Sequence, residues 1–207
     1  METLRYKLYI RIMTTNTATQ ILDTAQDLIQ RRGYVSVSFQ DIADRVGIKK
    51  PSIIHHFSSK AKLGEAIARR YRLFFADQME AIKSDPKKTV WDALEFYFSP
   101  YLEFAETDEK VCLFGALVGE IMTLPAEVRT EVKRFSESHQ RWLEDILREG
   151  AENGEFHLND TPSHVARVYF SALQGALLVK RSTGDYSQVK DVTDTIRKTL
   201  KEPQNHS

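Results

Sequence analysis

Residues 38–60, which read SFQDIADRVGIKKPSIIHHFSSK, constrain the fold of this chain more than any other stretch. Apolar residues at positions 39, 42, 43 and 46 have the i, i+3, i+4, i+7 spacing of one buried helical face. Ser38 suits the N-cap of that helix, and Gly47 permits the backbone conformation of a tight turn after it. Pro51 suits the first turn of a second helix, because its missing amide costs nothing there. The pattern predicts two short helices joined by a glycine turn.

The second of these helices, expected over Pro51–Phe57, carries side chains that suit contact with DNA. A helix-turn-helix module lays its second helix in the major groove, with its N-terminal residues at base edges and phosphates. Cations, hydroxyls and imidazoles are groups that phosphates and base edges accept. The predicted DNA-reading residues are Ser38, Lys49, Lys50, Pro51, Ser52, Ile54, His55 and His56. Taken singly, a Lys-Lys pair or adjacent histidines are typical of a solvated surface, so the prediction depends on their combination at this spacing.

The charges of the chain are divided unevenly along its length. Residues 1–72 hold 13 Lys and Arg against 6 Asp and Glu, and residues 73–207 hold 16 against 23. A basic N-terminal third attracts phosphate and predicts salt-dependent binding. The acidic remainder is repelled by DNA, which helps to orient the molecule.

Short motifs along residues 17–72 carry a family resemblance. In chain order they are Ile21-Leu22, Ala25, Arg32-Gly33-Tyr34, Asp41-Ile42-Ala43, Val46-Gly47-Ile48, His55-His56-Phe57 and Ser59-Lys60. With them the segment resembles the N-terminal domain of the TetR family of transcriptional regulators, which implies that Lys60 contacts phosphate. Pro51 stands where that family often has glycine, and Ile54 stands where it commonly has tyrosine. We therefore expect operator affinity or sequence preference to differ from the family norm.

Apolar periodicity predicts an all-α fold, and the resemblance implies a three-helix, helix-turn-helix DNA-binding domain followed by a helical ligand-binding and dimerisation domain. The expected parts are an N-terminal extension at 1–16, the DNA-binding domain at 17–63 and the ligand-binding and dimerisation domain at 64–202. Besides the DNA-reading pair, helices are expected at 17–32, 60–83, 89–106, 108–123, 125–153, 162–182 and 188–200. Pro100 is expected to kink its helix, and residues 35–38 permit a short strand.

Composition and motifs limit the other classes of protein. No run of 18 apolar residues exists, so we expect no membrane span, and the N-terminus lacks the apolar core of a signal peptide. The single cysteine forms no internal disulfide, which fits a cytoplasmic protein. HExxH, HxxxH, GxGxxG and CxxC are absent, so we expect no metal, cofactor or enzyme activity. Residues 1–12 are interpreted as an extension from an upstream start or, alternatively, as a basic arm for a DNA groove.

The resemblance implies a homodimer, whose two-fold symmetry suits a palindromic operator. The expected interface is a four-helix arrangement of residues 125–153 and 162–182 from each subunit. Its predicted residues are Phe135, Trp142, Ile146, Val165, Tyr169, Leu173 and Ala176. The same apolar face also fits a core within one subunit, and we expect it to serve as both.

The resemblance also implies an inducer cavity lined by the helices expected at 89–106 and 108–123. Aromatic residues at helical spacing are often simple core, whereas buried tyrosine hydroxyls need polar partners, as a binding site provides. The predicted ligand-binding residues are Trp91, Tyr97, Tyr101, Phe104, Cys112, Phe114, His139 and Gln174, with Gln140 as a further polar candidate.

Cys112 carries a separate hypothesis. It is expected in the first turns of the helix that follows Thr107, with Lys110 nearby, and a helix N-terminus and a cation both lower a thiol pKa. The segment VCLFGALVGEI resembles a TetR branch in which a cysteine senses electrophiles together with a lysine of a later helix, here Lys180 or Arg181. The alternative is that Cys112 is a small buried apolar residue.

These patterns predict a dimeric, sequence-specific DNA-binding regulator. By resemblance it is a repressor, released from its operator by a small apolar or aromatic inducer or by modification of Cys112. The resemblance also implies that the helix at 60–83 transmits the change to the DNA-reading helices. The alternative class is an all-α carrier or enzyme of small molecules whose basic N-terminal domain is incidental.

Overall fold

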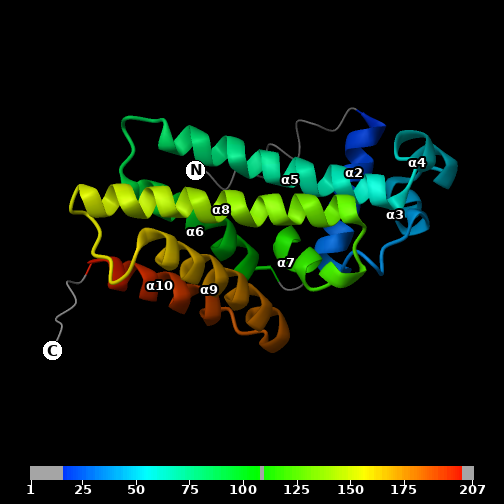
Figure 1. The fold of residues 1–207 in the computed structure, drawn as a ribbon. Coiled ribbons are helices and arrows are strands. Elements are labelled where there is room, and N and C mark those ends of the chain that lie inside the picture. Colours follow the sequence, from blue (N-terminus) through cyan, green and yellow to red (C-terminus); the bar gives the residue numbers. More distant parts are fainter. Residues whose placement is uncertain (1–15, 108–109, 202–207) are drawn as a thin grey trace.

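The computed structural model describes residues 16–107 and 110–201, and within these ranges it contains helices and no strand (Figure 1). This confirms the predicted all-α fold. The elements are α2 (Thr17–Arg32), α3 (Phe39–Val46), α4 (Lys50–His56), α5 (Lys60–Lys83), α6 (Val90–Ala105), α7 (Leu113–Val118), the 3-10 turn η1 (Ile121–Thr123), α8 (Ala126–Glu152), α9 (Pro162–Thr183) and α10 (Ser187–Lys201). The extension expected at 1–16 lies outside the described residues apart from Asn16, which caps α2.

The helices α2, α3 and α4 form a small unit at one end of the molecule (Figure 1). Ser38 caps α3 in a reciprocal capping box, because its hydroxyl accepts from the Asp41 amide while the Asp41 carboxylate accepts from the Ser38 amide. Gly47 ends α3 with φ 79°, a left-handed conformation that favours glycine. Ile42 and Ile53 are fully buried and hold α3 and α4 on α2. The predicted helix–glycine–helix pattern is confirmed.

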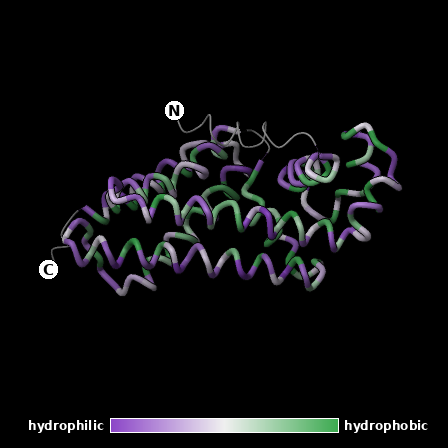
Figure 2. The backbone as a smooth tube through the Cα atoms, turned by 90° about the horizontal axis from the view of Figure 1, so that it is seen from above, coloured by the Kyte–Doolittle hydropathy of each residue, from purple (hydrophilic) through white to green (hydrophobic). Residues whose placement is uncertain are grey.

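The long helix α5 leaves this unit and runs beside α8 for most of its length (Figure 1). Helix α8 packs against α9 on its other side, and α10 packs against α9 and α6. Figure 2 shows hydrophobic and hydrophilic residues alternating along the helices, as expected for helices that bury one face. The C-terminal part is therefore a bundle of helices around a shared apolar core.

The helix expected at 108–123 is wrong in its extent. Helix α7 begins only at Leu113, and Cys112 is its N-cap residue rather than part of its first turns. Residues 110–112 run beside α2, where the Val111 amide donates to the Gln30 carbonyl at 3.3 Å. These contacts with a distant helix compete successfully with local helix formation.

The structure also bears on two other local predictions, a kink at Pro100 and a short strand at residues 35–38. Helix α6 continues through Pro100, and the Ser99 hydroxyl donates at 2.8 Å to the Phe96 carbonyl that the proline cannot bond. Residues 35–38 form no strand, because a turn follows Gly33 and the Ser36 hydroxyl donates to the Arg32 carbonyl at 2.5 Å. Both side chains replace backbone bonds that regular structure would have made.

Candidate DNA-reading surface and ligand cavity

Helix α4 presents most of the predicted DNA-reading residues to solvent. Ile53 is its buried anchor, and it faces the core while the rest of the short helix is exposed or half-buried. The exposed residues on and next to α4 are Lys49, Lys50, Pro51, Ile54, His55 and His56, and Ser52 is half-buried. The structure therefore brings cations, imidazoles and a hydroxyl together on one accessible helix, as a groove-reading helix requires.

Ser38 and Lys60 have structural contacts of their own. The Ser38 hydroxyl lies within the α3 capping box, with its oxygen 2.5 Å from Asp41 Oδ2. The Lys60 ammonium donates to the Val35 carbonyl at 3.0 Å and lies 4.7 Å from the centre of the Tyr34 ring. Partial burial lowers the pKa of Lys60. Because an ammonium has three donors, Lys60 keeps some for a phosphate while it fixes this turn.

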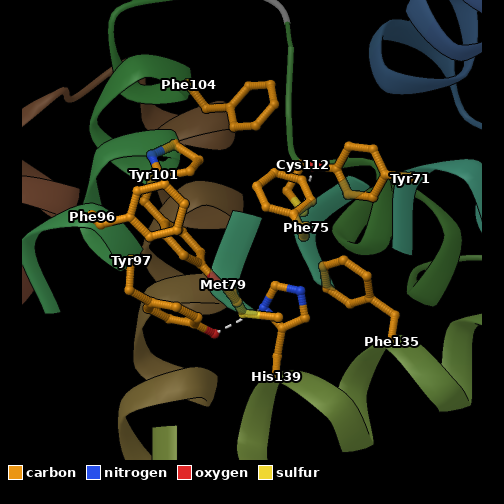
Figure 3. Close-up of a pocket in the computed structure, with 11 residues that line it drawn as sticks. Tyr71, Phe75, Met79, Phe96, Tyr97, Tyr101, Phe104, Cys112, Phe135 and His139 are labelled. Atoms are coloured by element: carbon orange, nitrogen blue, oxygen red, sulfur yellow. Dashed lines mark hydrogen bonds between the residues drawn. The ribbon is translucent and has the colours of Figure 1, made fainter. Parts of the chain in front are cut away.

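A cavity lies in the C-terminal part between α5, α6 and α8 (Figure 3). The space between its lining residues measures about 370 Å³, a volume that includes space open to solvent. Its lining residues are Tyr71, Phe75 and Met79 from α5, Phe96, Tyr97, Pro100, Tyr101 and Phe104 from α6, Phe135 and His139 from α8, and Cys112. Phe96 and Pro100 are only half-buried, so this stripe of α6 forms the mouth. The cavity is narrow, and an organic molecule must move ring side chains apart to enter it.

The polar groups of the cavity are connected to one another. The Tyr97 hydroxyl lies 3.1 Å from His139 Nδ1, and Gln174 Nε2 donates to the Tyr101 hydroxyl at 3.0 Å. Burial raises the pKa of Tyr97 and of Tyr101, and it lowers the pKa of His139 to about 3. All of these groups are therefore neutral at neutral pH, and the cavity offers hydrogen bonds without charge.

Sequence reasoning and structure overlap only in part at this cavity. Of the predicted ligand residues, the lining includes Tyr97, Tyr101, Phe104, Cys112 and His139. Trp91 instead packs edge-on against Phe156, with ring centroids 4.8 Å apart, and lies outside the cavity. Phe114 stacks behind Phe135 at 5.1 Å, and Gln174 supports Tyr101 from outside the lining. Gln140 is also absent from the lining.

The lining residues that sequence reasoning missed are Tyr71, Phe75, Met79, Phe96, Pro100 and Phe135. Residues 71, 75 and 79 recur at i, i+4, i+8 on α5, and residues 96, 100 and 104 do so on α6. That spacing places each set on one helical face, so it was a usable signal. From its sequence alone, α5 is expected only to connect the two parts of the chain.

The structure contradicts the expected lowering of the Cys112 pKa. The thiol is buried, and burial raises its pKa despite a hydrogen bond between Cys112 Sγ and the Tyr71 hydroxyl at 3.4 Å. Lys110 pairs with Asp27 of α2 rather than with the thiol. Lys180 is buried and donates to the carbonyls of Phe104 and Thr107. In this state Cys112 has the surroundings of a buried apolar residue.

Most of the predicted dimerisation residues face the interior of the subunit. The buried ones are Phe135, Trp142, Ile146, Tyr169, Leu173 and Ala176, and Val165 is half-buried. Trp142, for example, stacks on Tyr97 and donates to the Met79 carbonyl at 3.1 Å. Helix α9 has a different exposed apolar stripe, with Val168 62%, Leu178 45% and Val179 43% exposed. Residues 171 and 175 on the same face are small, a serine and a glycine.

The two ends of the molecule are joined by polar contacts as well as by α5. Gln30 of α2 is buried, and its Nε2 donates to the Val111 carbonyl at 3.1 Å. Near η1, the Glu120 carboxylate accepts from the Val35 amide at 3.0 Å. On α5 itself, Arg72 pairs at 2.9 Å with Glu131 of α8, which is 3% exposed. Hydrogen bonds of Val111 therefore join the segment that carries Cys112 to α2.

Two further features bear on the class of protein. No helix in residues 16–107 or 110–201 combines the length and apolar character needed to cross a bilayer. Over the same ranges, no group of three His, Cys, Asp or Glu side chains is placed to hold a metal ion.

Comparison with known proteins identifies the family. The family described as "Bacterial regulatory proteins, tetR family" matches residues 21–67, which contain α3 and α4. The description "Tetracyclin repressor-like, C-terminal domain" matches residues 91–196, which contain much of the cavity wall. The chain belongs to the TetR family of transcriptional regulators.

Individual relatives agree with this assignment. The HTH-type transcriptional repressor ComR of Escherichia coli (strain K12) is 25% identical over 178 residues, covering 84% of each chain. A TetR transcriptional regulator from Legionella pneumophila has the same fold with a TM-score of 0.83 and 29% identity, covering 91% of this chain and 100% of its own. The reduced form of E. coli NemR superimposes with a TM-score of 0.79 at 19% identity, covering 91% and 99% of the two chains, which shows a shared fold.

Proposed function

We propose that this chain is a dimeric repressor that reads operator DNA with α4 and releases it when a small, mainly apolar molecule enters the cavity. The observation that carries the proposal is the course of α5. This helix begins at Lys60, directly after the reading helix, and its later residues Tyr71, Phe75 and Met79 form one wall of the cavity. A ligand that separates α5 from α6 therefore acts on the helix that is connected to the reading head, which is the unit of α2, α3 and α4.

The coupling follows from differential affinity. A ligand shifts an equilibrium only as far as it binds one state better than the other. The narrow cavity supports such a difference, because a state with α5 moved outward accommodates the ligand with less crowding. Movement of α5 changes the separation of the two α4 helices in a dimer, so that they no longer fit successive major grooves.

The dimer interface that fits this subunit is the exposed stripe of α9. Val168, Leu178 and Val179 provide apolar surface, and Gly175 between them permits close approach of a second helix. The charged exposed face of α8 then forms the border of the interface. This arrangement keeps the four-helix interface of α8 and α9 from each subunit that the family implies, and it replaces the buried residues by exposed ones.

Release by a non-covalent ligand is favoured over modification of Cys112. A thiol reacts as its thiolate, and burial raises the pKa of Cys112. A Cys112→Ser variant keeps a small polar group at this position. It is expected to retain ligand-induced release, whereas complete loss of release would restore the cysteine hypothesis.

Removal of a positive charge from α4 tests whether this helix binds DNA. We expect Lys50→Ala to weaken binding to DNA selected from a genomic library by about tenfold, because a phosphate or base contact is lost. The matched control is Lys87→Ala, which removes another exposed lysine, from the loop between α5 and α6. Fluorescence anisotropy of labelled DNA measures both affinities. Equal affinities for the two variants would assign DNA binding to another surface.

A further inference from the structure

Two buried polar atoms near the cavity have no hydrogen-bond partner within the described residues. They are Nε2 of His139 and Oε1 of Gln174. Buried polar groups in folded proteins almost always have a partner, so such an atom beside a cavity points to a bound group. His139 is 4% exposed and belongs to the cavity lining, whereas Gln174 lies behind it. Nε2 of His139 is therefore the unpaired atom that a ligand in the cavity contacts.

The hydrogen bond to Tyr97 decides which nitrogen of His139 carries the proton. The imidazole is neutral at neutral pH, because burial lowers its pKa to about 3. His139 Nδ1 lies 3.1 Å from the Tyr97 hydroxyl, and which of the two donates depends on the tautomer of the ring; we take the phenol as the donor. The single imidazole proton then resides on Nε2. With this tautomer, His139 offers the cavity an N–H donor at Nε2.

The ring of His139 is held in one orientation by its neighbours. Phe135 stacks on it with centroids 3.8 Å apart, and Phe75 approaches it at 5.7 Å. In Figure 3 the ring nitrogen that is not bonded to Tyr97 turns toward the side of the cavity formed by Phe75 and Phe135. The donor is therefore placed among aromatic walls, where a flat molecule fits.

The remaining lining excludes charge. All other lining side chains are aromatic or aliphatic, apart from the tyrosine hydroxyls and the Cys112 thiol. An anion placed here loses its hydration without gaining a cation, which strongly disfavours it. A molecule without any acceptor leaves the His139 N–H unsatisfied, which disfavours it for the opposite reason.

We propose that the cavity binds a neutral, mainly apolar molecule with a carbonyl-type oxygen that accepts a hydrogen bond from His139 Nε2. The inference rests on the proposed function, because it names the class of ligand for the same cavity. It assigns His139 as the specificity-determining residue and Tyr97 as the residue that positions its proton.

Three small probes of similar size test the proposal on the full chain. Acetophenone is neutral and has a carbonyl, ethylbenzene lacks an acceptor, and benzoate is charged. Calorimetry is expected to show that wild type binds acetophenone about tenfold more tightly than ethylbenzene, the size of one buried hydrogen bond, and benzoate most weakly. Equal affinities for acetophenone and ethylbenzene, tightest binding of benzoate, or no binding of any probe would overturn the proposal.

Two variants connect the preference to the residues. His139→Phe keeps a ring but has no donor, so it is expected to bind acetophenone and ethylbenzene equally. Tyr97→Phe frees Nδ1 and is expected to reduce the preference severalfold, which keeps the test open even if His139→Phe does not fold. A preference that persists unchanged in both variants would also overturn the proposal. DNA binding without probe is measured on the same samples, so that failure of ligand selection is distinguished from failure of the regulator assignment.

Discussion

The surroundings of His139 determine both the orientation and the protonation of its ring. The imidazole is stacked on Phe135, bonded to Tyr97 and removed from water, and it accordingly stays neutral. A histidine is often a switch near neutral pH. Here burial keeps the imidazole neutral, so His139 does not act as a switch near neutral pH.

The protonation of His139 predicts a dependence of stability on pH. Its pKa is about 3 when folded and near 6.5 when exposed, so between these values the unfolded state binds one more proton than the folded state. The free energy of unfolding therefore falls as pH falls through this window, by at most about 1.4 kcal/mol per pH unit. Lowering the pH from about 7.5 to about 5 is expected to cost wild type about 2 kcal/mol more than His139→Phe.

Urea unfolding at the two pH values measures this difference. His139→Gln serves as a second reference, because its amide is polar but does not titrate. Parallel loss of stability in wild type and both variants would contradict the assignment of a neutral, buried His139.

At the scale of elements, the segment before α7 links the cavity to the reading head. Cys112 lines the cavity, and its neighbour Val111 is bonded in both directions to Gln30 of α2. The ion pair of Lys110 with Asp27 adds a second contact to the same helix. Two hydrogen bonds and an ion pair therefore tie this segment to α2.

Gln30→Leu tests this link. It leaves the Val111 carbonyl without its side-chain donor, and we expect the free energy of unfolding to fall by about 1–3 kcal/mol. The matched control Gln20→Leu alters an exposed position of the same helix and is expected to change stability by less than about 0.5 kcal/mol. Urea unfolding gives both values. A Gln30→Leu effect as small as the control would show that the link is unimportant.

The sequence predicted local elements better than long-range contacts. The α3–α4 pair followed from Ser38, Gly47 and Pro51, because caps and turns are encoded by neighbouring residues. The start of α7 did not, because the contact between Val111 and Gln30 joins residues 81 positions apart. No local pattern contains that information.

The same contrast between local pattern and long-range packing applies to the cavity and to the dimer interface. Aromatic residues of α6 could be recognised from their spacing, but the wall supplied by α5 depends on how that helix packs. Apolar residues such as Phe135 and Leu173 fitted an interface and a core equally well by sequence. Only packing separates the two, since a core and a dimer interface are built from the same apolar residue types.

At the scale of the whole molecule, the charge of the chain matches its shape. Within the described residues, the end formed by α2, α3, α4 and the start of α5 (Figure 1) carries Arg31, Arg32, Arg45, Lys49, Lys50 and Lys60, against Asp23, Asp27, Asp41 and Asp44. The neutral net charge of the whole chain thus conceals an uneven distribution of charge along the sequence, which favours the N-terminal third as the part that approaches DNA. Two such heads joined through α9 suit half-sites about one helical turn, roughly 34–36 Å, apart.

The most direct test of a dimeric repressor is a gel shift on the DNA immediately upstream of the gene for this chain, at low and moderate salt. The account predicts a sequence-selective complex with two chains per fragment, weakened as salt rises. Binding that is equally strong on unrelated DNA, a stoichiometry of one chain per fragment, or the absence of any complex on this DNA and on fragments selected from the whole genome would contradict it.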